Sequence, residues 1–195
     1  PYLKKFENKK KILFYNKYSD LKNIIKTCSK FFVCIGNNNG EDRSAIAKKL
    51  ISKKLEPLNL IHKKTIIHTS AKIGKMVMIM PGVVINPNVK IHDFCVINTS
   101  AVIEHDCILK DGVEIMGSAS LAGNCLVKKN VTVGTNATIF PSIILNENSY
   151  VGSGSVVRHN VKKSYIMVGN PAKFLKKNTV SKNRLKKTLI NLNNL

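Results

Sequence analysis

The chain has 195 residues, with 32 Lys or Arg against 11 Asp or Glu and a formal net charge of +21. Its 44% of hydrophobic residues exclude a disordered chain, because such a content can bury a core. No apolar run approaches the roughly 20 residues that a membrane-spanning helix needs. We therefore expect a folded, basic protein that does not span a membrane.

The first 62 residues predict a small α/β domain. After a lysine-rich stretch without the pattern of a secretion signal, residues 31–35 are typical of a buried strand. A helix is predicted from Asp42 to Leu55, and a second strand over residues 58–61. Together they indicate part of a Rossmann-like unit over residues 1–62. Four helix residues are expected on one apolar face: Ala45, Ile46, Leu50 and Ile51.

A six-residue repeat dominates the rest of the sequence. Starting at Ile67, the first residue of each of sixteen successive sixes is Ile, Leu or Val. The fifth residue is nearly always small or β-branched, and the fourth is Asn, Ser, Gly or Asp in all but two repeats. These fourth residues accept tight turns and left-handed backbone angles, so each repeat carries its own corner.

This pattern predicts flat sides that stack as short parallel strands, with three sides closing one coil of a β-helix. An ordinary β-sandwich would instead show a period of two and lose phase at its loops. The fold class is therefore mainly β, with a β-helix over residues 63–162 and a C-terminal extension over residues 163–195. The extension has leucines at helical spacing near its end, which fit either a short helix or a frayed terminus.

The distribution of charge narrows the possible partners. Residues 67–161 carry seven basic and six acidic side chains, so nearly all of the positive charge lies in the flanks. It is mostly Lys without interleaved aromatic residues, whereas reading of bases relies on Arg and on stacking. We expect no nucleic-acid binding. The lysines either reflect an A+T-rich genome or attract small molecules that carry phosphates.

The five cysteines show no C-x-x-C spacing and no even pairing. This argues against a disulfide framework or a zinc site and favours reduced thiols in the cytoplasm. Cys95, Cys107 and Cys125 occupy the fifth, inward position of their repeats and are expected to pack as small core residues. No three histidines are spaced to converge on a metal.

One histidine stands out by its place in the repeat. His105 is a third residue, which projects outward, and Asp106 follows it at the corner. A carboxylate beside an outward imidazole can fix its tautomer and stabilise its charged form, as a general base requires. The alternative is a surface histidine that is merely solvated.

Five segments resemble the left-handed β-helix acetyltransferases, and within them the nucleotide-amino-sugar N-acetyltransferases that make bacillosamine and related sugars. They are residues 31–38, 59–63, 84–86, 97–107 and 169–173. The related sialic acid O-acetyltransferases share the pattern. The resemblance covers Phe31 to Lys173 and implies a left-handed β-helix, acetyl-CoA as cosubstrate, and a homotrimer with active sites between subunits. The family's opening Gly-rich turn with a histidine has no counterpart before Phe31.

The resemblance also implies roles for individual residues. His105 would be the general base and Asp106 its orienting partner, at a position where the family often has Glu. Asn98 and Glu114 would contact the substrate, although close relatives can have His at the latter position. The residues expected to bind acetyl-CoA are Ala122, Gly123, Thr135, Gly152, Ser153 and Lys173, with the Gly123 N–H on the acetyl carbonyl.

The predicted function is therefore acetyl transfer from acetyl-CoA to the amine of a nucleotide-linked amino sugar of the 4-amino-4,6-dideoxy type. The transfer would be direct, without an acyl-enzyme. Two alternatives stay open: O-acetylation of a sugar hydroxyl such as that of sialic acid, and a non-catalytic trimeric scaffold that uses the basic flanks.

Overall fold

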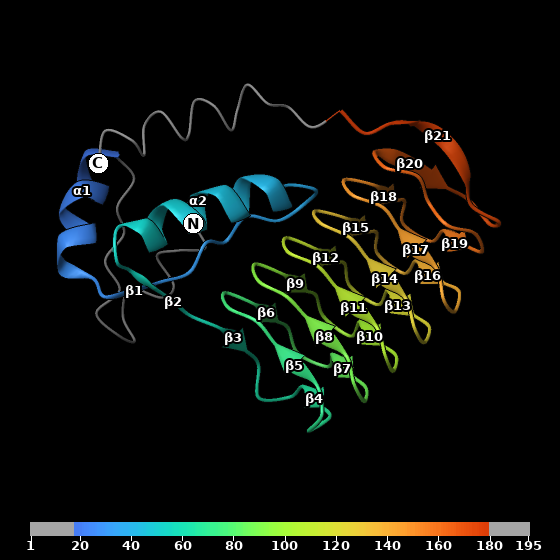
Figure 1. Ribbon diagram of the computed structural model, residues 1–195, viewed down its shortest axis with the longest axis horizontal. Coiled ribbons are helices and arrows are strands. Elements are labelled where there is room, and N and C mark those ends of the chain that lie inside the picture. Colours follow the sequence, from blue (N-terminus) through green and yellow to red (C-terminus); the bar gives the residue numbers. More distant parts are fainter. Residues whose placement is uncertain (1–17, 180–195) are drawn as a thin grey trace, which may run out of the picture.

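A computed structural model describes the backbone of residues 18–179 and the side chains from residue 23 onwards. The lysine-rich first 17 residues and the predicted leucine-containing tail lie outside the described residues. The described part is a parallel β-solenoid of about six turns with a small helical unit along one of its edges (Figure 1). Neither described helix is long and apolar enough to cross a membrane.

Three sheets form the sides of the solenoid, and the chain visits them in the order face I, face II, face III. Face I contains β3 (Leu60–Ile61), β6 (Met78–Ile79), β9 (Val96–Ile97), β12 (Glu114–Ile115), β15 (Thr132–Val133), β18 (Tyr150–Val151), β20 (Tyr165–Val168) and β21 (Lys173–Lys177). Face II contains β4 (Ile66–Ile67), β7 (Val84–Ile85), β10 (Val102–Ile103), β13 (Ser120–Leu121), β16 (Thr138–Ile139) and β19 (Val156–Val157). Face III contains β5 (Lys72–Ile73), β8 (Lys90–Ile91), β11 (Ile108–Leu109), β14 (Leu126–Val127) and β17 (Ile144–Leu145).

The register confirms the six-residue repeat. From β3 to β19, each strand pairs in parallel with the strand 18 residues away, as Ile103 does with Ile85 and with Leu121. The first residue of each repeat from Ile79 onwards is buried in one continuous core, together with the small fifth residues. The sixteen predicted sides are β4 to β19, and β3 adds one more side before them.

The corners follow the prediction equally closely. From Met76 to Gly154, the fourth residue of each repeat has a φ between +53° and +74°. Asn, Ser, Asp and Gly tolerate this conformation, but a bulky apolar residue rarely adopts it. The two bulky exceptions, Met76 and Phe94, lie on the corner between faces III and I. Both are buried there against Val33 and Ala47 of the helical unit.

The helical unit consists of α1 (Tyr18–Thr27), β1 (Lys30–Phe31), α2 (Gly40–Ser52) and β2 (Glu56–Pro57). β1 and β2 are parallel, so a strand-helix-strand unit is present. The predicted second strand is wrong in its bounds, because within residues 58–61 only Leu58 donates a backbone hydrogen bond to β1. Glu56–Pro57 takes that place, and Leu60–Ile61 joins the solenoid beside Met78–Ile79. Of the four residues predicted on the apolar face, Ile46 and Leu50 are partly buried against the core of the helical unit, whereas Ile51 is exposed. The residues of the helix that are buried are Gly40, Asp42, Arg43, Ser44 and Ala47.

Helix α2 runs along the corner between faces III and I, and its first turn meets the backbone there (Figure 1). A Cβ on Gly40 would overlap the carbonyl oxygen of Gly112, so only glycine allows this approach. The fully buried Arg43 binds three carbonyl oxygens: its Nε donates to Phe94 at 2.8 Å, one Nη to Gly112 at 3.1 Å, and the other Nη to Ile35. Burial lowers the pKa of the Arg43 guanidinium, while Glu114 opposes the shift.

Glu114 holds the loop before α2. It projects from face I and is only 2% exposed. Its Oε1 accepts the N–H of Asn37 at 3.0 Å and its Oε2 that of Asn38 at 3.3 Å. Both asparagines have a positive φ, so their successive N–H groups form a nest for the carboxylate. An Nη of Arg43 lies 4.0 Å from Oε2. The carboxylate and the guanidinium therefore connect the helical unit to the solenoid.

Removal of this carboxylate should release α2 from the solenoid. Glu114→Ala leaves the N–H groups of Asn37 and Asn38 without their acceptor and the buried guanidinium of Arg43 without its ion pair, which should cost about 3 kcal/mol. We expect amide hydrogen exchange in α2 to be about 100-fold faster, with little change in the solenoid core. As a control, Glu147→Ala removes a half-exposed pair with Lys128 and should change stability by less than about 0.5 kcal/mol. Equal exchange in both variants would contradict the assignment.

Candidate active site

His105 and Asp106 lie at the corner between faces II and III, directly after β10. The imidazole is 60% exposed, as expected for an outward third residue. Its Nδ1 lies 2.8 Å from Oδ2 of Asp106. The sequence therefore predicted both the outward direction of the ring and its carboxylate neighbour.

Asp106 is held from two sides. Its Oδ1 accepts a hydrogen bond from Nδ2 of Asn88 at 3.1 Å, one coil earlier. The bond with His105, followed by the bond with Asn88, lowers the pKa of the carboxyl group. An ionised carboxylate can only accept, so Nδ1 of His105 carries the proton in this bond. The lone pair of the neutral ring is then on Nε2, where a general base needs it.

Nε2 lies over Gly123 on the next coil. A Cβ on this glycine would be 2.6 Å from both Nε2 and Cε1 of His105, so any side chain there would push the ring away. Gly123 thereby allows the imidazole to lie flat against the solenoid. Within residues 18–179, the Gly123 N–H has no hydrogen-bond partner. A proton acceptor and a residue with an unused backbone donor thus lie side by side.

The other residues expected to bind acetyl-CoA lie at two different corners. Ala122 adjoins Gly123 at the corner between faces II and III. Thr135, Gly152 and Ser153 follow β15 and β18, at the corner between faces I and II. Both corners border face II, on its opposite sides, so a single chain does not bring the two sets together. Lys173 is exposed on β21, which pairs antiparallel with β20.

The two residues expected to contact the substrate line one cavity. Asn98 and Glu114 face a hollow of about 210 Å³ between face I and the segment from Val33 to Gly36. Both carboxylate oxygens of Glu114 already bind the loop, and the Asn98 amide donates to the Ile115 carbonyl at 3.2 Å. This cavity lies on another side of the solenoid than His105.

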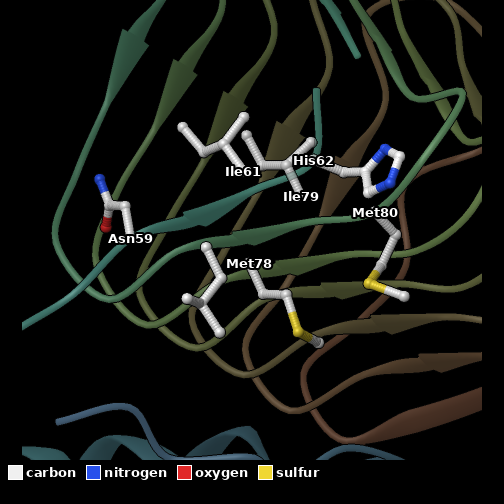
Figure 2. A pocket seen from close by; sticks show the side chains of 7 residues that line it. Asn59, Ile61, His62, Met78, Ile79 and Met80 are labelled. Atoms are coloured by element: carbon white, nitrogen blue, oxygen red, sulfur yellow. The ribbon is translucent and has the colours of Figure 1, made fainter. Parts of the chain in front are cut away.

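His62 does not offer a better base. It lines an apolar pocket of about 380 Å³ at the start of face I, where Figure 2 shows it beside Met80 and away from Asn59. Its Nδ1 accepts the N–H of Lys64 at 3.1 Å, and no carboxylate lines this pocket. Among the histidines of the described residues, only His105 forms an ion pair with a carboxylate.

The cysteines behave as core residues. Cys95, Cys107 and Cys125 are at most 1% exposed and form no disulfide. Burial raises the pKa of the Cys95 thiol to about 12, which makes it a poor nucleophile. Across the described part of the chain, no three His, Cys, Asp or Glu side chains gather closely enough to hold a metal ion.

Sequence reasoning missed two functional contacts. Asn88 lies 18 residues before Asp106 at the same repeat position, so the stacking of coils could have revealed their bond. Arg43 carries the docking of the helical unit, but a buried cation leaves no trace in an apolar periodicity.

Comparisons with known proteins agree with this geometry. Residues 70–105 match the family model "Bacterial transferase hexapeptide (six repeats)". A search of curated protein sequences finds no match.

Several solved structures, among them an acetyltransferase domain, are similar over most of the chain. PerB from Caulobacter crescentus, crystallised with CoA and GDP-perosamine, is 29% identical with a TM-score of 0.76, over 82% of this chain and 75% of that one. The acetyltransferase domain of PglB from Neisseria gonorrhoeae with acetyl coenzyme A is 26% identical with a TM-score of 0.74, over 78% and 76%. WeeI from Acinetobacter baumannii is 25% identical with a TM-score of 0.75, over 80% and 76%. The resemblance stated from the sequence is thus confirmed.

The two hydrogen bonds of Asp106 predict how its pKa changes when either partner is removed. Because its pKa is lowered, the carboxylate stays ionised to a lower pH than the carboxylate of an ordinary Asp. Removing either partner should raise the pKa of Asp106, with a larger rise for His105→Ala than for Asn88→Ala. Carbon-13 NMR titration of the side-chain carboxyl measures it. An unchanged pKa in both variants would show that the bonds are absent in solution.

Proposed function

We propose that this protein transfers the acetyl group of acetyl-CoA to the amino group of a nucleotide-linked amino sugar, of the 4-amino-4,6-dideoxy type. One observation carries the proposal: the imidazole of His105 bonds to an ionised Asp106 through Nδ1 and places Nε2 over Gly123. The similar PerB and PglB structures, which hold CoA with GDP-perosamine and acetyl coenzyme A respectively, support this substrate class.

The chemistry follows from the two groups in contact. His105 accepts a proton at Nε2 as the amine nitrogen attacks the thioester carbonyl, so no acyl-enzyme is needed. The Gly123 N–H donates to the carbonyl oxygen as negative charge develops on it. Asp106 is a positioning residue, because it keeps the proton on Nδ1 and stabilises the imidazolium that forms. The thiolate of CoA then leaves and takes up a proton.

A homotrimer would complete this site. His105 is 60% exposed at a convex corner, and a base on such a surface lacks the walls of a pocket. The residues expected to bind CoA are divided between the two corners that border face II. A neighbouring copy would place its own Thr135, Gly152 and Ser153 opposite Ala122 and Gly123, forming a groove between two solenoids. Lys173 would reach the phosphates at the end of this groove.

The acceptor sugar nucleotide would extend from His105 to the cavity of a neighbouring subunit. Asn98 lines that cavity and can present its amide oxygen to the ligand. Glu114 would act indirectly, through the loop that it holds and that forms the opposite wall.

We also propose the handedness of the solenoid and the bounds of the three parts of the chain. The solenoid would be left-handed, over residues 63–162, with a Rossmann-like remnant over residues 1–62 and an extension over residues 163–195. The parallel pairing of β1 and β2 around α2 supports the Rossmann-like character. The free thiols of Cys28, Cys34 and the three core cysteines support a cytoplasmic address.

The proposed role of His105 as general base predicts how its removal changes turnover. His105→Ala should lower turnover about 10²- to 10⁴-fold, because no other group takes the proton from the amine. Its affinity for acetyl-CoA should be unchanged, since the ring contacts the reacting atoms alone. Turnover is measured with a nucleotide-linked 4-amino sugar and acetyl-CoA, and affinity by calorimetry. Near-normal turnover of this variant would contradict the role of His105.

The same assay separates the alternatives. The wild-type protein should acetylate the 4-amino sugar nucleotide and leave its 4-hydroxyl counterpart unmodified. Transfer to the hydroxyl alone would assign the protein to O-acetylation. If calorimetry detects no acetyl-CoA binding by the wild-type protein, it is a scaffold and the proposal fails.

A further inference from the structure

We propose that Lys72 and Lys90 on face III bind the diphosphate of the nucleotide-linked substrate, in a hollow that adjoins Asp106. This inference deepens the proposed function and rests on it for the identity of the substrate. The hollow measures about 370 Å³ and receives two residues from each of three successive coils: Ser70, Lys72, Asn88, Lys90, Asp106 and Ile108.

The two lysines stack in register. Lys72 on β5 pairs directly with Lys90 on β8, so their side chains leave the sheet on the same side, at the strand spacing of about 4.8 Å. Like charges directly opposite each other on adjacent strands destabilise a sheet. The later coils of face III do not repeat the arrangement: Lys90 pairs on its other side with Ile108, and the next pairs are Ile108 with Leu126 and Leu126 with Ile144.

In the described chain, no carboxylate lies within ion-pair distance of either lysine. Neither Lys72 nor Lys90 forms an ion pair in the described residues, where the pairs are Lys30–Glu56, Arg43–Glu114, His105–Asp106 and Lys128–Glu147. Asp106 lines the same hollow, but its two oxygens accept from His105 and Asn88. A bound anion with two negative groups would supply the missing charge, and a diphosphate has the size and charge to contact both ammonium groups.

The position of the two lysines favours binding of the acceptor substrate over binding of CoA. Lys90 lies one coil before His105 and Lys72 lies two coils before it, whereas Gly123, Thr135 and Ser153 lie in later coils. With the thioester at Gly123, CoA extends towards those later coils. The acceptor must approach His105 from the other side, and its diphosphate then lies over β5 and β8. The sugar amine would reach Nε2 while the phosphates stay one or two coils away.

The test measures binding and does not depend on turnover. Lys72→Met together with Lys90→Met removes both charges and keeps the apolar stems of the side chains. We expect calorimetry to show GDP or UDP binding at least about tenfold more weakly than to the wild type, since charge-assisted hydrogen bonds to phosphate are lost. The affinities for GMP, UMP and CoA should change little. Lys72→Arg with Lys90→Arg should bind the diphosphates much like the wild type.

A matched control variant shows whether a loss of diphosphate affinity is specific to Lys72 and Lys90. Lys162→Met with Lys163→Met removes two exposed lysines at the far end of the solenoid and should bind like the wild type. Unchanged diphosphate affinity in the Lys72/Lys90 variant would overturn the inference, as would a loss confined to CoA or a wild type that binds neither GDP nor UDP. If the lysine variant fails to bind diphosphate but the wild type transfers no acetyl group, the phosphate site stands and the proposed reaction falls.

Discussion

The stacking of identical corners every 18 residues is the constraint on which this protein depends. Each six-residue side of a coil places its aliphatic first residue and its small fifth residue inside, and the chain turns at the fourth residue, which has a positive φ. Because the backbone hydrogen bonds run from coil to coil, residues at the same repeat position form straight columns. A side chain at a corner is therefore fixed in relation to the coils before and after it.

The candidate site uses two such columns, which together span three coils. Asn88 reaches Asp106 from the preceding coil, Asp106 orients His105, and His105 lies on Gly123 of the following coil. No flexible loop takes part, so the geometry of the base is set by the solenoid backbone. Lys72 and Lys90 extend the same logic to face III, where two coils present like charges side by side. A column of like charges that destabilises the sheet and has no oppositely charged partner within the protein indicates a place where a ligand binds.

The sequence predicted the solenoid and the outward direction of His105 because both follow from a strict local period. It did not predict the first strand of the solenoid, since Leu60–Ile61 directly follows the helical unit and resembles its second strand. The pair of Arg43 and Glu114 also escaped prediction, because it joins segments that are distant in the chain. Met76 and Phe94 broke the corner rule, and the structure explains both exceptions by their contact with α2 and its neighbouring residues.

A crystal structure with CoA and a nucleotide-linked 4-amino sugar tests the central claim most directly. The account predicts that the amine nitrogen lies about 3 Å from Nε2 of His105, with the sulfur of CoA beside Gly123 and a second copy of the chain closing the groove. Both ligands bound at a corner that excludes His105, or within a single isolated solenoid, would contradict it.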